Sequence, residues 1–234
     1  MIYLKQNGII FLKPRKVAGT SFEIALSKFA KNEDILTKID DNDERIRREL
    51  GFPGAKNYKK NVSEWNSRDL YNFTKRGLLA EKFYNHISAK EIKNNIGQSK
   101  FDSEFKIYII RNPYDMIISM YFWENRGNER PESLEGWLRK NPSILRANYD
   151  QYYIDGACII DYFVRFENFE EDITKLEELR SLKGLWCTFK EINAKGGIRP
   201  KSATLSDTLQ RNHDIVDVIR FFNKELIERF EYSI

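Results

Sequence analysis

Two segments of this chain share one order: an apolar run, a polar loop, then an amphipathic helical pattern. This order constrains the fold more than any other feature. The first segment spans residues 8–29, and the second spans residues 107–121. In each, the residues after the loop recur at the i, i+3, i+4 spacing of a helix with one buried face. In the second, Asn112 suits the helix cap and Pro113 the first turn. Each segment is therefore predicted to form strand, loop and helix.

The pattern continues towards the C-terminus. A third strand is predicted at Tyr162–Phe166, followed by a helix over 169–179, and a closing helix is predicted over 215–230. Apolar strands that alternate with amphipathic helices favour an α/β fold in three layers, a parallel sheet with helices on both faces. No internal repeat or linker interrupts the sequence, so residues 1–234 are expected to form one domain.

One region departs from this pattern. Residues 39–71 are dense in Lys, Arg, Asp, Glu and Asn, with Phe52, Tyr58 and Trp65 interspersed. We interpret them as a polar insertion. Because α/β proteins bind ligands at the carboxyl edge of the sheet, the insertion is expected to lie over that edge.

Composition excludes several classes of protein. A hydrophobic content of 41% suffices for a core, and no apolar run approaches the ~20 residues of a membrane span. Residues 1–8 lack the apolar stretch of a signal peptide, so a cytoplasmic protein is expected. Cys158 and Cys187 are too few for a disulfide framework and are not spaced with the histidines as metal ligands. The net charge of +4 does not indicate nucleic acid, and attraction to an anion must come from local clustering.

The first loop has the composition of a phosphate site. Lys13, Arg15 and Lys16 precede Gly19-Thr20-Ser21 at a predicted helix N-terminus, where backbone amides and the helix dipole favour an anion. A routine Ser or Thr cap beside a solvated basic loop is the alternative. The lysine precedes the glycine, which is the wrong order for a Walker A loop, so an ATP or GTP P-loop is disfavoured.

The second loop suggests another anion site. Arg111 ends a strand, and Ser119 lies two turns into the following helix. A guanidinium binds phosphate through two donors, and a hydroxyl adds a third. The alternative is a surface arginine and a serine bonded to its own helix.

Taken together, the two loops resemble those of sulfotransferases that use 3′-phosphoadenosine 5′-phosphosulfate, in particular the carbohydrate-type and bacterial branch. The first motif of that family is matched by residues 16–21 and the second by residues 111–121, in the right order and about ninety residues apart. Residues 164–169 and 230–232 resemble two further family segments. The chain departs from the family pattern where Arg15 separates Pro14 from Lys16, and where Met116 replaces a basic residue.

This resemblance implies a P-loop-NTPase-like fold and transfer of a sulfuryl group to an acceptor hydroxyl of a carbohydrate, lipid or small alcohol. It implies that Lys16 stabilises the charge that develops on the leaving phosphate. It assigns Gly19, Thr20 and Ser21 to the 5′-phosphate, and Arg111 and Ser119 to the 3′-phosphate. The further cofactor-binding candidates are Arg15 and Ala18 in the first loop, and Arg199 and Lys201 in a late basic loop that would lie over the 3′-phosphate and adenine.

The acceptor must lose a proton, so a general base with a pKa near neutrality is wanted. His86 is the candidate, at a predicted strand-to-helix turn before a Ser88–Glu91 capping box. A histidine satisfied by the backbone is the alternative. Glu167 is a second candidate, although pairing with Arg165 or with a loop amide would explain it equally well. No metal cluster is visible, and none is expected.

The sequence leaves two other functional hypotheses open. A nucleotide-dependent kinase of related fold is the nearest enzyme alternative. A non-catalytic nucleotide or nucleic-acid binding module is the alternative from another class. Under the leading interpretation the partners are a cofactor and a glycan or small-molecule acceptor, with no nucleic acid.

Overall fold

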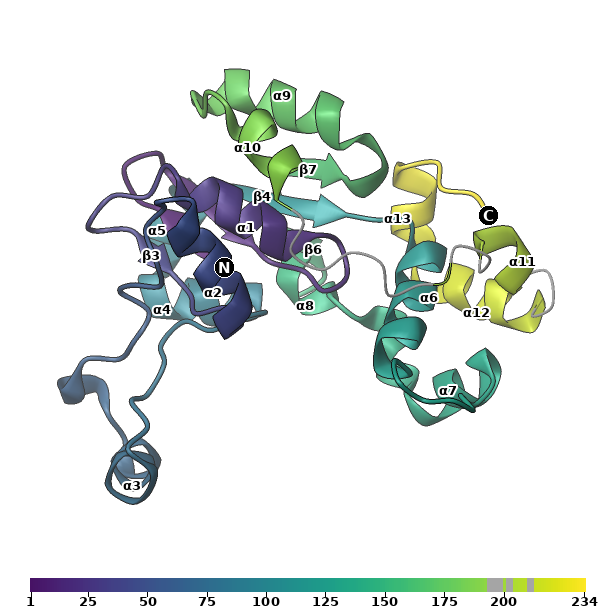
Figure 1. Cartoon of the computed structure of the whole chain (residues 1–234), viewed down its shortest axis with the longest axis horizontal. Coiled ribbons are helices and arrows are strands. Elements are labelled where there is room, and N and C mark those ends of the chain that lie inside the picture. The colour runs from purple at the N-terminus through teal and green to yellow at the C-terminus, as the bar shows by residue number, and fades with distance from the viewer. Residues whose placement is uncertain (193–199, 201–203, 210–212) are drawn as a thin grey trace.

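A five-stranded mixed sheet forms the centre of the molecule (Figure 1). The computed structural model describes residues 1–192, 200, 204–209 and 213–234. The strand order is β3-β1-β2-β4-β7. The bounds of the five strands are β1 Ile2–Leu4, β2 Ile9–Leu12, β3 Ile35–Leu36, β4 Phe105–Ile110 and β7 Tyr162–Arg165.

The prediction of an all-parallel sheet is wrong at one edge. β2, β4 and β7 are parallel, whereas β1 is antiparallel to both β2 and β3. Only residues 5–8 join β1 to β2, and this is too short for a parallel crossover. Gly8 turns the chain at a φ of 61°. The parallel part comprises the three strands whose apolar runs were recognised in the sequence.

Helices cover both faces of the sheet, because successive residues of the central strands point to opposite sides. Ile9, Phe11, Ile107 and Ile109 face one cluster of buried apolar side chains, and the residues between them face another. On the first face lie α1 Gly19–Ser27, α2 Asp41–Glu49, α9 Phe169–Arg180 and α10 Leu185–Glu191. On the second lie α4 Ala89–Ile96, α5 Gln98–Ser103, α8 Tyr149–Tyr152, the β5 Tyr153–Ile154 and β6 Ala157–Cys158 hairpin, and α13 Lys224–Arg229.

A third cluster of apolar side chains lies beyond the carboxyl ends of the strands. Its helices are α6 Pro113–Glu124, α7 Leu134–Lys140, α11 Leu205–Leu209 and α12 His213–Phe222, together with the 3-10 turn η2 Pro142–Arg146. The single closing helix predicted over 215–230 is two helices. At the break, the Asn223 side chain donates hydrogen bonds to the carbonyl oxygens of Leu145 and Ile219.

The predicted position of the polar insertion is wrong. Leu36 pairs with Lys56 in an antiparallel bridge, which turns the chain back along the edge strand, and a second bridge joins Lys59 to Glu81. Figure 1 shows η1 Val62–Glu64 and α3 Ser67–Arg76 projecting from the body, away from α6 and α7. None of residues 39–71 lines the cavity described below.

Buried charges attach α2 to the sheet. Glu23 of α1 is fully buried, with one carboxylate oxygen 2.7 Å from the Lys13 ammonium and the other 3.7 Å from a terminal nitrogen of Arg47 on α2. Burial raises the pKa of Glu23. The charges of Lys13, the Met1 amino group and Arg47 outweigh burial, and the pKa falls to about 2. The cluster therefore requires an ionised carboxylate.

No helix among the described residues is both long enough and apolar enough to cross a bilayer.

We predict that Glu23→Gln lowers the free energy of unfolding by about 3–5 kcal/mol, because it leaves buried cations uncompensated. In the unchanged protein, the stabilisation from Glu23 is present above its ordinary pKa of 4.5 and is lost as the pH falls towards 2. Urea unfolding between pH 7 and pH 3 measures both effects. Glu33→Gln, at an exposed position, is the control and should match the wild type. Equal stability of the two variants would contradict the role of the cluster.

Candidate functional site

An open cavity of about 1330 Å³ lies at the carboxyl ends of β2 and β4. The parallel register places Leu12 opposite Tyr108, so the loops that follow the two strands begin at the same edge of the sheet. The candidate residues that line this cavity are Arg15, Lys16, Ala18, Gly19, Thr20, Ser21, His86, Arg111 and Ser119. The structure thus brings together segments that are far apart in the sequence. Arg199 and Lys201 lie outside the described residues.

The first loop turns tightly before α1. Lys16 and Ala18 both adopt left-handed backbone conformations, with φ of 63° and 56°. A Cβ at Gly19 would lie 3.2 Å from both the Lys13 side chain and the Pro14 carbonyl oxygen, so the loop passes closely over this glycine. When residues in the left-handed conformation alternate with residues in the right-handed conformation, successive backbone amides point into one concavity that can bind an anion.

The N-terminus of α1 carries no side-chain cap. Its N-cap residue is Ala18, whose side chain has no oxygen that could accept a hydrogen bond from the amides of the first turn. Thr20 and Ser21 lie within the first turn. The alternative in which one of them serves as a routine N-cap is therefore excluded, and the helix start faces the cavity with its dipole.

The second loop is linked directly to the first. The Arg111 guanidinium donates one hydrogen bond to the Lys16 carbonyl oxygen at 2.6 Å and another to Asp115 at 2.7 Å. It stacks on the Phe166 ring, 4.1 Å from the ring centroid. Arg111 therefore fixes the separation of the two loops. Part of the hydrogen-bonding capacity of its guanidinium is already used by Asp115.

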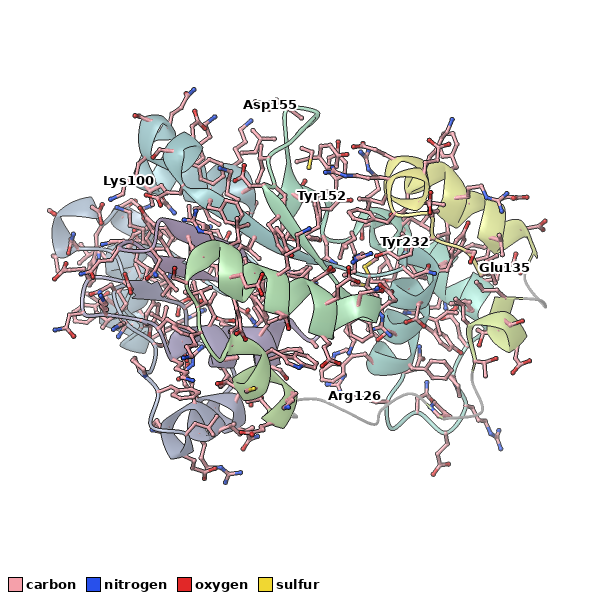
Figure 2. All side chains as sticks on the ribbon, turned by 90° about the horizontal axis from the view of Figure 1, so that it is seen from above. Lys100, Arg126, Glu135, Tyr152, Asp155 and Tyr232 are labelled. Atoms are coloured by element: carbon pink, nitrogen blue, oxygen red, sulfur yellow. The ribbon has the colours of Figure 1, made fainter. Side chains whose placement is uncertain are left out.

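Glu167 holds the second loop from behind. Its carboxylate accepts hydrogen bonds from the Asn112 amide at 2.8 Å and from the Tyr232 hydroxyl at 3.2 Å. Burial, followed by the charge of Glu167, raises the pKa of Tyr232. Tyr232 follows α13 and lies beside α6 (Figure 2), where the Asn112 side chain also bonds the Ser233 carbonyl oxygen. Because Glu167 does not line the cavity, the structure favours the loop-amide explanation over a general base.

His86 faces the cavity from the loop between α3 and α4, so the predicted strand-to-helix turn is wrong. Its Nδ1 lies 3.0 Å from the Lys13 carbonyl oxygen. Because a carbonyl only accepts, Nδ1 must donate, and the neutral ring has an unprotonated Nε2. Burial, with further contributions from the charges of Lys13 and Arg15, lowers the pKa of His86 to about 4. The expected pKa near neutrality is therefore wrong for the protein without a ligand.

Asn148 is a residue that the sequence analysis missed. Its side chain forms two hydrogen bonds with the backbone of Arg15: the amide oxygen accepts from N–H at 2.8 Å, and the amide nitrogen donates to C=O at 3.2 Å. Gln151, one turn later, donates to the His86 carbonyl oxygen. These contacts attach α8 to the first loop and to His86. Asn148 adopts a left-handed backbone conformation, with a φ of 73°. Asparagine is common at such positions in ordinary turns, so the sequence gives no sign that this one supports a site.

Trp123 was assigned no function from the sequence, yet it forms part of the cavity wall. The Lys16 ammonium lies 3.9 Å from the centroid of its ring, and the Arg126 guanidinium lies 4.2 Å from it. Trp123 follows Ser119 by four residues, one turn along the same helix. A spacing of four residues places two side chains on the same face of a helix, so the sequence could have predicted that Trp123 lies beside Ser119.

The cavity is rich in cations without carboxylate partners. Arg15, Arg126, Arg146 and Lys190 line it and form no ion pair among the described residues, and the remaining residues of the chain include no Asp or Glu. Two acidic residues line it, Glu124 and Asp150, and Glu124 accepts a hydrogen bond from Trp137. Within the described ranges, no group of three His, Cys, Asp or Glu side chains is placed to hold a metal ion. The site is suited to an anion.

Comparisons with known proteins identify no family. No family model and no solved structure matches the chain. An uncharacterized protein from Archaeoglobus fulgidus is 28% identical over 89 residues, which cover 36% of this chain and 74% of that protein. The site must therefore be interpreted from its own geometry.

We predict that His86 stays neutral from pH 8 to about pH 5 and titrates near pH 4, because burial and neighbouring cations oppose its protonation. The chain has two histidines, so His86→Gln assigns the imidazole resonances in ¹H–¹⁵N spectra. The spectra should also show a protonated Nδ1 and an unprotonated Nε2. Titration of this ring between pH 6 and 7 would contradict the prediction.

Proposed function

We propose that the chain is a sulfotransferase that moves a sulfuryl group in line from 3′-phosphoadenosine 5′-phosphosulfate to an acceptor hydroxyl. The observation that carries this proposal is the Arg111–Lys16 hydrogen bond, which joins the two family-like loops at one cationic cavity. A cofactor with phosphate at both ends requires two adjoining anion sites. The unpaired cations and the uncapped α1 terminus match that requirement.

Each residue has a physical role in this proposal. The amides of residues 18–21 and the hydroxyls of Thr20 and Ser21 hold the 5′-phosphate end, and Arg111 with Ser119 holds the 3′-phosphate. The cofactor supplies an activated sulfuryl group. The Lys16 ammonium, held over the Trp123 ring at the cavity wall, would stabilise the negative charge that develops on the departing phosphate.

His86 accepts the proton of the acceptor hydroxyl at Nε2. A pKa of about 4 makes the isolated ring a weak base. Burial is the main cause of that low pKa, and the charge of Arg15, which has no carboxylate partner among the described residues, adds to it. An anion bound beside Arg15 would balance this charge and so raise the pKa of His86. The Lys13 carbonyl holds the ring in the required tautomer throughout.

The alternatives are less well supported. A kinase needs acidic residues to hold Mg²⁺, and of the two acidic residues lining the cavity Glu124 is engaged by Trp137. A non-catalytic binding module would explain the cations, but not a histidine held with its free nitrogen beside the phosphate loop. The acceptor is a carbohydrate, lipid or small alcohol hydroxyl.

We predict that the chain binds adenosine 3′,5′-bisphosphate without magnesium, and more tightly than AMP or ATP. Ser119→Ala should reduce the preference for the 3′-phosphate by roughly tenfold, as expected for one hydrogen bond to a charged group. Arg111→Ala should abolish it. Isothermal titration calorimetry measures both, with Ser99→Ala, an exposed serine on α5, as the matched control. Equal affinity of the wild type for AMP would refute the assignment of the second loop.

We predict that Lys16→Ala lowers sulfuryl transfer by a hundredfold or more while weakening binding of the bisphosphate much less, because the lysine acts mainly in the transition state. The measurement is transfer of sulfur label from the cofactor to a panel of glycans, lipids and small alcohols. Lys31→Ala, at an exposed position, is the control. Equal losses in rate and in affinity would contradict this role, and tight nucleotide binding with no label transferred to any acceptor would favour a binding module.

A further inference from the structure

The projecting segment at residues 58–82, here called the arm, buries very little of its apolar surface. It comprises η1, α3 and the two chains that connect them to the body (Figure 1). No residue of α3 is buried. The large apolar side chains that the arm exposes are Val62 at 73%, Leu70 at 55%, Tyr71, Phe73, Leu78 at 56% and Leu79. So many exposed large apolar side chains in one short segment favour an interaction surface.

α3 is nevertheless a well-formed helix. Asn66 and Asp69 form a capping box at its start, and Gly77 ends it in the left-handed conformation. Ten residues are too few for a stable isolated helix in water, and the ring contact between Trp65 and Phe73 is small support. The caps, and the Lys59–Glu81 bridge between the two connecting chains, hold the shape. The apolar face lacks a partner within the described chain.

The arrangement around the helix is amphipathic. At about 100° per residue, Leu70, Tyr71, Phe73 and Thr74 fall within about 160° of the circumference. Arg68 and Lys75 come next, beside Tyr71, and Arg76 flanks the opposite border of the face, beside Phe73. Long basic side chains beside an apolar face can extend their charges to the level of lipid headgroups while the stems remain in apolar surroundings.

Charge identifies the kind of partner. The arm carries six basic and three acidic residues, a net charge of +3, against +4 for the whole chain. Lys60 pairs with Asp69, and Lys82 pairs with Glu64. Arg68, Lys75 and Arg76 form no ion pair among the described residues, and the remaining residues include no carboxylate side chain. Two arms packed together would place like charges side by side, which opposes self-association.

We propose that the arm docks on an anionic membrane surface, with its apolar face in the interface and the side chains of Arg68, Lys75 and Arg76 among the headgroups. Aliphatic side chains such as Val62, Leu78 and Leu79 suit acyl chains. This surface lies away from the cavity, so docking leaves the candidate site open. The inference does not depend on the reaction proposed above.

Vesicle co-sedimentation of the full chain tests this inference. The wild type should sediment with vesicles of equal parts phosphatidylcholine and phosphatidylglycerol, and much less with phosphatidylcholine alone or in high salt. The triple variant Arg68→Gln, Lys75→Gln, Arg76→Gln should lose about a hundredfold in partitioning, at roughly fivefold per charge. The triple variant Leu70→Ser, Leu78→Ser, Leu79→Ser should also lose at least tenfold. All six substituted residues are exposed, so circular dichroism should show that both variants are folded.

Phe221→Ser with Val218→Ser is the matched control, because both residues are exposed apolar side chains on α12. This control should bind vesicles as the wild type does. The inference is overturned if the wild type ignores anionic vesicles, or if the arm variants bind unchanged. It is also overturned if the wild type is a dimer in sedimentation velocity that the leucine variant dissociates and no vesicle binding is seen. That outcome would assign the arm to a second copy of the chain.

Discussion

The buried ion pair between Lys13 and Glu23 is the constraint on which the rest of the structure depends. Lys13 leaves the central strand β2 at the point where the first loop begins, and Glu23 lies one turn inside the helix that follows. Their contact at 2.7 Å folds the loop back over the helix N-terminus. The same carboxylate meets Arg47, so α2 is fixed by the charge that fixes the loop. Such a cluster tolerates little rearrangement, because a displaced ion would remain buried without a partner.

The remaining contacts of the first loop extend from this base. The carbonyl oxygens of Lys13, Arg15 and Lys16 each accept from a different part of the chain: His86, Asn148 and Arg111. The loop therefore serves as the common attachment for three segments that surround the cavity. These contacts engage carbonyl oxygens of the loop, while residues 18–21 at the start of α1 line the cavity. Backbone amides at a helix start that faces a cavity are what an anion site requires. The proposed sulfotransferase chemistry uses this arrangement, and the arm stands apart from it.

Several parts of the fold were predictable, and the reasons are physical. The strands β2 and β4 are buried on both faces, so they appear as continuous apolar runs, whereas β7 is an edge strand in which only Val164 is buried. The helices α1 and α6 follow from their periodicity and from the Asn112 cap. β1 was missed because three residues give little pattern, although Asn7-Gly8 is a recognised hairpin signal. The insertion was misplaced because its position depends on the Leu36–Lys56 pairing, which no local feature of the sequence specifies.

The sequence alone determined which residue types gather at the site. Cations, small residues and hydroxyls follow two apolar strands, and parallel strands bring the residues at their carboxyl ends to one edge. Only the tertiary structure decided how those residues are engaged: Lys13 neutralised beneath the loop, Arg111 shared with Asp115, Glu167 used as a support and His86 with its pKa lowered to about 4. Charge state and hydrogen-bond partner depend on burial and on contacts between residues distant in the chain, and these exist only once the chain has folded.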